Sequence, residues 1–167
     1  MQNKRLYIFL AIISLFFMLP VSAQFNDEMD KELLPPVTFK IIQGKEPVKA
    51  AQENTLKIKF SVMPGYHINI IPAFKIDAKI KDSNIKIEAT PVIDEKEVKK
   101  ARKLVADGKP AYLDDSREHP FKIMVTGISK KSKLDVAWTV TLYYCSEKDG
   151  LCYRKELKSN SKLDVIK

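Results

Sequence analysis

Apolar and polar residues alternate along most of the chain beyond residue 36. A period of two puts every second side chain on one face, as in a strand with one buried side. The alternating segments are residues 37–41, 56–62, 76–80, 85–89, 121–125 and 134–144. The triplet Asp82-Ser83-Asn84 marks a turn between two of them. Short strands separated by turns, with no long helical pattern, predict an all-β sandwich.

One charged insertion, residues 91–120, interrupts this pattern. Within it, apolar residues recur at helical spacing between positions 94 and 107. These residues are Val98, Ala101, Leu104 and Val105. The stretch is bracketed by Pro91, Gly108 and Pro110, and it forms either a short amphipathic helix or a long loop over the sandwich. Long insertions in compact domains often carry function, although many do not.

Residues 1–23 have the pattern of a secretory signal peptide. Lys4 and Arg5 precede an apolar run over residues 6–19, and Pro20-Val21-Ser22-Ala23 supplies a cleavage site. The alternative is an uncleaved anchor, but this run is shorter than the roughly 20 residues that span a membrane. We therefore expect cleavage near Ala23, a loose leader over residues 24–36, and one domain over residues 37–167. The mature protein is then periplasmic or secreted, with no stable membrane anchor.

Composition supports a single globular domain. The 167 residues are 45% hydrophobic and 30% charged with only 5 Gly, which excludes collagen-like and largely disordered chains. The formal net charge of +8 favours acidic partners or anionic surfaces. We expect no nucleic-acid binding, because no basic helix or stacking aromatic cluster accompanies the charge.

The two cysteines of the chain flank a turn signal. Cys145 ends the longest alternating segment, Lys148-Asp149-Gly150 forms the turn, and Cys152 opens a short strand-like run. Opposed residues at the neck of a hairpin come within disulfide range, and thiols outside the cytoplasm are commonly oxidised. The sequence therefore predicts a Cys145–Cys152 disulfide.

This disulfide is either a structural staple or a working redox pair. Closing an eight-residue loop contributes about 2.5 kcal/mol by the chain-entropy formula, which a domain of this size does not require. Exposed cross-strand bridges are also more easily reduced. No C-x-x-C motif or adjoining base accompanies the pair, so if it turns over it acts as an acceptor for a partner thiolate, and we then expect the attack on Cys152, the more open position.

Other polar candidates have simpler roles. We expect His67 to pack or to hydrogen-bond in a turn, His119 to be exposed at a loop edge, and Trp138 to lie in the core. The spacing of the cysteines and histidines matches no zinc pattern, so we expect no metal site. No Ser-His-Asp or paired-carboxylate arrangement is evident from the sequence.

Two motifs resemble a known family. Residues 56–69, LKIKFSVMPGYHIN, resemble the early strand and the Pro-Gly-aromatic-His turn of the N-terminal periplasmic domain of the thiol:disulfide interchange protein DsbD. The hairpin of residues 143–153, YYCSEKDGLCY, resembles the cysteine hairpin of the same family. It is equally similar to the DsbD-N-like domain appended to some secreted thioredoxin/NHL-repeat proteins. The resemblance covers residues 37–166.

The resemblance implies an immunoglobulin-like β-sandwich that relays reducing equivalents outside the cytoplasm. Such domains receive electrons from a thioredoxin-like partner and pass them to disulfide isomerases or to cytochrome c maturation proteins. The activity implied is that of a protein-disulfide reductase or interchange component, without a cofactor. The matching residues are the redox cysteines Cys145 and Cys152, the flanking Tyr144 and Tyr153, and the turn residues Gly65, Tyr66 and His67.

The chain also departs from the family pattern. Arg154-Lys155 stand where the family usually has prolines, and the spacing between the cysteines is one residue longer. The family shields its cysteines with a cap loop, which would correspond to residues 91–120, where Tyr112 is the sole aromatic residue. The membrane and thioredoxin domains of full-length DsbD would have to act in trans, as a membrane electron transporter and exported thioredoxin-like proteins. The alternative function is a non-catalytic immunoglobulin-like binding module with a structural disulfide.

Overall fold

Strands dominate the computed structural model, which describes residues 35–128, 130 and 132–167. The expected signal peptide and all of the leader except Pro35 and Pro36 lie outside the described residues. The elements in chain order are β1 (Val37–Ile42), β2 (Val48–Lys49), β3 (Glu53–Val62), β4 (Tyr66–Ile68), β5 (Lys75–Lys79), β6 (Lys86–Pro91), α2 (Glu95–Ala106), β7 (Glu118–Thr126), β8 (Ser132–Ser146) and β9 (Cys152–Ile166). The predicted all-β class is confirmed.

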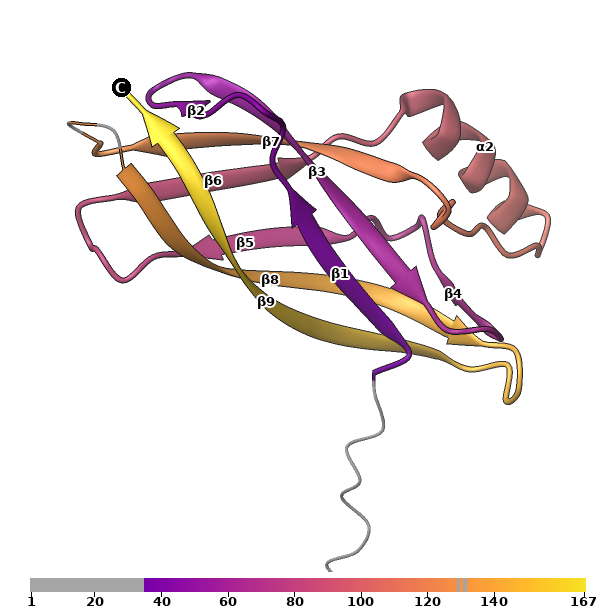
Figure 1. The fold of residues 1–167 in the computed structure, drawn as a ribbon. Helices are drawn as coiled ribbons and strands as arrows, with labels where there is room; N and C mark the ends of the chain where they lie inside the picture. Colours follow the sequence, from indigo (N-terminus) through magenta and orange to yellow (C-terminus); the bar gives the residue numbers. More distant parts are fainter. Residues whose placement is uncertain (1–34, 129, 131) are drawn as a thin grey trace, which may run out of the picture. The chain divides into compact units, whose positions relative to one another are not determined.

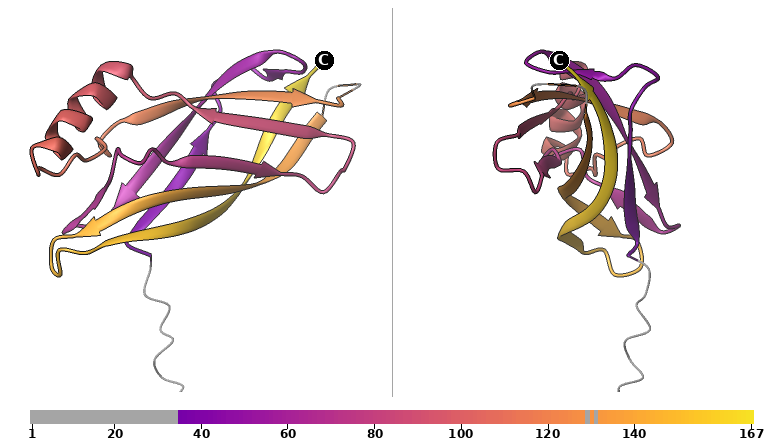
Figure 2. Two further views of the ribbon diagram at one scale, coloured as in Figure 1. Left: turned by 180° about the vertical axis from the view of Figure 1, so that it is seen from behind. Right: turned by 60° about the vertical axis from the view of Figure 1, so that its left-hand side comes forward.

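The strands form two sheets (Figure 1). One sheet has the order β1-β3-β7-β6, and the other has the order β2-β9-β8-β4, with β5 also paired to β8. The pairings are antiparallel except the short parallel contact between β2 and β9. The strands are strongly curved, as the two views of Figure 2 show.

Alternate residues of both sheets meet in one apolar core. Trp138 of β8 is fully buried, as predicted, and its ring meets that of Phe121 of β7 edge-on at 5.8 Å between centroids. The indole Nε1–H donates to Ser161 Oγ at 2.8 Å, so the polar atom of this buried ring has a partner. The period-two pattern thus sets which face of each strand is buried.

The charged insertion contains a helix, which resolves the choice between helix and loop. Asp94 caps α2, because its carboxylate accepts the backbone N–H of Lys96 at 2.9 Å. Ala101 is buried, whereas Val105 remains 51% exposed. The helix therefore packs against the rest of the domain through a narrow apolar stripe, and not through a broad apolar face.

Strand β9 is longer than the short run expected from the sequence. It pairs with β8 from Cys152 to Val165, through a polar segment, residues 158–162, that shows no apolar alternation. Cross-strand hydrogen bonding to the strongly patterned β8 sets its length. Near its end, the Gln43 side chain donates to the carbonyl oxygen of Asp164 at 2.9 Å and accepts its N–H at 3.0 Å.

The β8–β9 hairpin has its turn at the opposite end of the sheet from the C-terminus (Figure 1). The start of β1 lies near the same end of the domain as the β8–β9 turn (Figure 1). There Val37 pairs with Val62 of β3, just before the separate turn that leads into β4. In the described part of the chain, no helix has the length and apolar character needed to cross a membrane.

Candidate functional site

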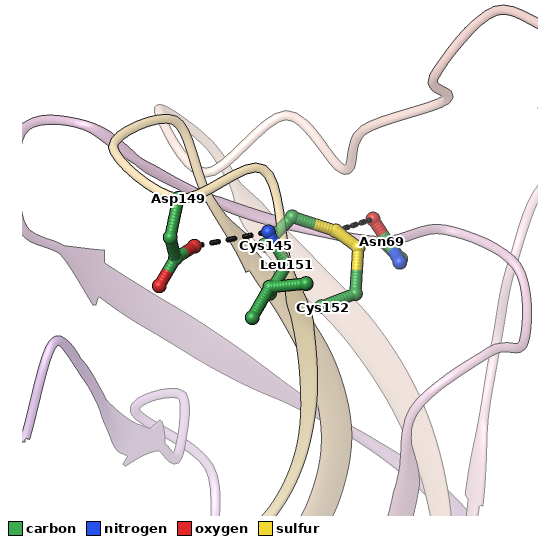
Figure 3. Close-up of a disulfide and its surroundings, with 5 residues drawn as sticks. All are labelled: Asn69, Cys145, Asp149, Leu151 and Cys152. Carbon is green, nitrogen blue, oxygen red and sulfur yellow. Dashed lines mark hydrogen bonds between the residues drawn. A yellow bond between two sulfur atoms is a disulfide. The ribbon is translucent and has the colours of Figure 1, made fainter.

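The two cysteines form a disulfide at the neck of the β8–β9 hairpin (Figure 3). Cys145 and Cys152 are directly opposed in the strand register, with an S–S distance of 1.98 Å and a Cα–Cα distance of 3.9 Å. The predicted pairing is confirmed. Because directly opposed residues share a face of the sheet, both sulfur atoms lie on the face away from Trp138 and the core.

The hairpin turn is closed by hydrogen bonds of its own. The Ser146 N–H donates to the Leu151 carbonyl at 2.9 Å, and the Gly150 N–H donates to the Ser146 carbonyl at 3.0 Å. The Asp149 carboxylate accepts the Leu151 N–H at 2.9 Å and the Tyr153 hydroxyl at 2.7 Å. The Tyr153 bond and then the Leu151 bond lower the pKa of Asp149. The turn therefore has a defined shape that does not depend on the disulfide alone.

The two sulfur-bearing residues differ in their access to solvent. Cys145 is only 8% exposed, because β4 and β9 flank it on both sides. Cys152 is exposed at the start of β9, beside Leu151, which is 57% exposed. The expectation that Cys152 is the more open cysteine is confirmed.

His67 lies beside Cys145 on the next strand. The two residues are paired in the β4–β8 register, so their side chains share the outer face. His67 Nε2 donates to Glu147 Oε1 at 2.6 Å, and its ring stacks on Tyr112 with centroids 4.4 Å apart and planes at 12°. The expected packing and hydrogen-bonding role of His67 is confirmed. Cys152, Cys145 and His67 thus form a row across three neighbouring strands. The ring of Tyr112, from the charged insertion, stacks at the end of this row.

The remaining site candidates lie on the opposite face. Tyr66, Tyr144 and Tyr153 form a chain of rings, with centroid distances of 5.9 Å between the first two and 5.5 Å between the last two. Strand alternation turns them away from the sulfur atoms, although Tyr144 and Tyr153 adjoin the cysteines in sequence. Burial raises the pKa of Tyr144. These tyrosines support the hairpin from the core side.

Asn69 is a site residue that the sequence analysis missed. Its Oδ1 atom lies 3.1 Å from Cys145 Sγ (Figure 3). Asn69 follows β4 and stands between Ile68 and Ile70, both buried. A polar residue between two apolar ones is ordinary strand alternation, so the sequence alone carries no signal that marks Asn69.

The charged insertion reaches the site through its return segment, residues 111–113. Tyr112 forms an isolated β-bridge with Asn69, and the Leu113 N–H donates to the Ile68 carbonyl at 2.8 Å. The Ile70 N–H donates to the Ala111 carbonyl at 3.1 Å. The insertion is therefore attached to β4 beside the disulfide, with the ring of Tyr112 on His67.

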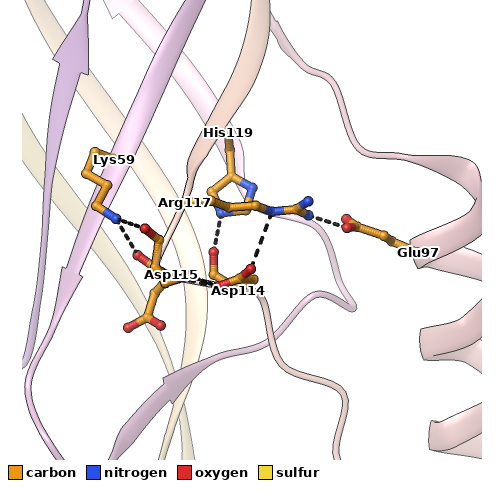
Figure 4. A network of polar contacts seen from close by, with 7 residues as sticks. Lys59, Glu97, Asp114, Asp115, Arg117 and His119 are labelled. Carbon is orange, nitrogen blue, oxygen red and sulfur yellow. Dashed lines mark hydrogen bonds and ion pairs between the residues drawn. The ribbon is translucent and has the colours of Figure 1, made fainter.

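The expectation for His119 is wrong. It is 5% exposed in β7 rather than exposed at a loop edge, because its position in the alternation, two residues before Phe121, turns it towards the core. Its ring lies near those of Phe60 and Phe74, and its Nε2–H donates to the Asp114 carbonyl at 2.8 Å (Figure 4). Burial lowers the pKa of His119.

Polar contacts around His119 fix the end of the charged insertion (Figure 4). Lys59 of β3 donates to the carbonyl oxygens of Asp115 at 2.9 Å and Ser116 at 2.5 Å. Arg117 forms an ion pair with Glu97 of α2. These contacts join α2 and the insertion's return segment to the four-stranded sheet, so they position the insertion rather than form a reactive centre.

Other recognisable site types are not seen near the disulfide. Among the described residues, no three His, Cys, Asp or Glu side chains are grouped as a metal site. A groove of about 660 Å³ lies towards the other end of the five-stranded sheet, lined in part by Lys79, Asp135 and Lys162.

No protein-family model matches the chain, and neither does any curated protein. The likeness to the DsbD N-terminal domain therefore rests on the two sequence motifs, residues 56–69 and 143–153.

Proposed function

We propose that this domain is a thiol–disulfide relay that acts outside the cytoplasm and passes reducing equivalents through the Cys145–Cys152 pair. The observation that carries the proposal is the unequal exposure of the two cysteines. Exposed Cys152 offers its sulfur to an incoming thiolate, while Cys145 is largely shielded by its neighbouring strands. Exchange requires access to one sulfur and a leaving group on the other.

The exchange proceeds in two steps. A partner thiolate attacks Cys152 Sγ, the S–S bond breaks, and its electron pair leaves with Cys145 Sγ. The result is a mixed disulfide between the partner and Cys152. A second thiolate of the partner then attacks its own sulfur in that bond and releases the Cys152 thiolate, which leaves the partner oxidised and the domain as a dithiol.

Two features of the hairpin support repeated cycling. The turn keeps its backbone hydrogen bonds when the S–S bond breaks, because none of them involves sulfur. Exposed Leu151, the turn residue next to Cys152, gives a docking partner apolar surface. Partners of this kind are exported thioredoxin-like proteins and a membrane electron transporter acting in trans.

A redox titration tests the proposal. The purified domain is equilibrated with glutathione buffers, and the fraction of dithiol is read from alkylation of the free thiols. We expect the pair to be reduced at a potential above about −300 mV. A bond that stays oxidised below about −300 mV belongs with inert structural bridges, and that result would favour the binding-module alternative.

Trapping provides a second readout with a matched control. Each single-cysteine variant is mixed with a thioredoxin-like protein whose one active-site cysteine carries a chromogenic leaving thiol. Cys145→Ser retains the exposed Cys152 and should form the mixed disulfide rapidly. Cys152→Ser retains only shielded Cys145 and should react slowly, and equal rates would contradict the proposed direction of attack.

A further inference from the structure

The contact between Asn69 and Cys145 differs in nature between the two redox states. In the disulfide, Cys145 Sγ carries no hydrogen, so the 3.1 Å approach of Asn69 Oδ1 is a contact without a proton. In the dithiol, the same sulfur is an S–H group, which is a weak hydrogen-bond donor. An amide oxygen at this distance is placed to accept that hydrogen.

The backbone of Asn69 is held from both sides in a way that does not involve sulfur. Its N–H donates to the Tyr143 carbonyl of β8 at 2.8 Å, and it forms the bridge to Tyr112 on the other side. The adjoining bonds of Ile68 with Leu113 and of Ile70 with Ala111 extend this support. The acceptor is therefore already in position before the disulfide is reduced.

We infer that Asn69 is a positioning residue that accepts a hydrogen bond from the Cys145 thiol and so stabilises the dithiol relative to the disulfide. The inference rests on the proposed function, in which the pair is reduced during turnover. When the S–S bond breaks, its electron pair leaves with Cys145 Sγ, and this thiolate takes a proton from solvent. The new S–H group then donates to Asn69 Oδ1.

The same contact gives the two cysteines different tasks. Asn69 adjoins Cys145, which leaves first, and lies on the side of β8 away from β9 and Cys152. A hydrogen bond to the leaving sulfur favours the reduced pair and disfavours the return attack of Cys145 on the mixed disulfide. Asn69 thus tunes how readily the domain accepts reducing equivalents, while Cys152 makes the covalent contact.

The test compares Asn69→Leu, which removes the acceptor at similar size, with the wild-type protein in glutathione buffers. One net hydrogen bond corresponds to a factor of about 2–10 in an equilibrium constant, and a weak S–H donor belongs at the low end of that range, so the variant should be roughly twofold harder to reduce. Asn160→Leu is the matched control, because Asn160 is exposed on the same sheet face far along β9. That control should leave the constant unchanged, and an unchanged constant in Asn69→Leu overturns the inference.

A second measurement separates this inference from the proposed function. In the Cys152→Ser background, Cys145 is a lone thiol whose pKa is read from the ultraviolet absorbance of the thiolate. Asn69→Ala, which removes the acceptor without adding apolar bulk beside the thiol, should lower that pKa, and Asn69→Asp, which keeps an oxygen acceptor and adds charge, should raise it. A rise in Asn69→Ala would mean that the amide donates to the thiolate, and this would overturn the inference. The measurement retains its meaning even if the disulfide resists glutathione.

Discussion

Reduction of the disulfide should weaken this domain without unfolding it. The proposed relay spends part of each cycle as a dithiol, so the proposal requires the fold to persist when the Cys145–Cys152 bond is broken. The perturbation is full reduction with a phosphine, which changes no side chain other than the two cysteines. We expect the reduced protein to keep its fold and to lose at most about 2.5 kcal/mol of unfolding free energy.

The magnitude follows from the position of the cysteines. They are separated by 7 positions, so the bond closes a loop of about eight residues in the unfolded chain. The chain-entropy formula gives about 8.3 cal/mol/K for such a loop, or about 2.5 kcal/mol near room temperature. This value is an upper limit, because the bonds within the turn and the long β8–β9 register bias the reduced chain towards the same hairpin.

The assay is equilibrium unfolding in urea, followed by the fluorescence of Trp138, the single tryptophan of the chain. Its full burial in β8 makes it a reporter of the core. The oxidised and fully reduced forms are measured in separate titrations, because partial reduction would mix two equilibria. The double variant Cys145→Ala/Cys152→Ala is the control, since reductant should not shift its midpoint.

A loss well above the limit would refute this reasoning. If reduction removes more than about 4 kcal/mol, or if the native fluorescence is lost without urea, the hairpin depends on the covalent bond. The hydrogen bonds of the turn would then be insufficient to hold it, and the pair would have to be regarded as a structural staple. Cycling between redox states would be incompatible with such a domain.

Three other substitutions test the described packing. His119→Gln keeps a donor to the Asp114 carbonyl but does not titrate. Burial lowers the pKa of His119 in the folded protein, so the unfolded chain binds the proton first and wild-type stability should fall as the pH drops from about 7 to about 5. An equal dependence of the urea midpoint on pH in the wild-type protein and in His119→Gln would contradict this. Asp94→Ala removes the cap of α2 and should cost about 1 kcal/mol locally, seen as roughly fivefold faster amide exchange in the helix, whereas Asp94→Asn should retain protection. Gly127→Ala should lose roughly 1–3 kcal/mol in urea unfolding, since its Cβ would collide with the Asn84 carbonyl oxygen at a φ of +84°, while Gly150→Ala, which has open space around it, should lose less.

Local patterning predicted the parts of the fold in which one face is buried. The alternation around Trp138 identified β8, and the turn signal before Cys152 identified the hairpin and its disulfide. The length of β9 was not predictable in this way, because its polar middle is held by pairing with β8 rather than by burial of its own side chains. Such pairing depends on a neighbour, which a single strand's sequence does not reveal.

The sequence predicted the disulfide of the site, but not the residues that surround it. The cysteines and His67 are close in the sequence to turn signals, so their neighbourhood could be inferred. The approach of Asn69 to Cys145 joins residues 76 positions apart, and the stacking of Tyr112 on His67 depends on how the charged insertion returns to β4. His119 is buried although a proline follows it, because Pro120 lies within β7 and not in a loop.

The placement of the hairpin turn and the C-terminus at opposite ends of the five-stranded sheet affects how the protein can be handled. The strands of the hairpin are 15 residues each, which corresponds to roughly 50 Å of extended chain. A tag or a chip linkage joined after Lys167 would therefore sit far from Cys152 and leave that sulfur facing the solution. A bulky fusion joined just ahead of Val37 would instead lie near the end of the domain that carries the hairpin turn (Figure 1), where it would obstruct large proteins while still admitting glutathione.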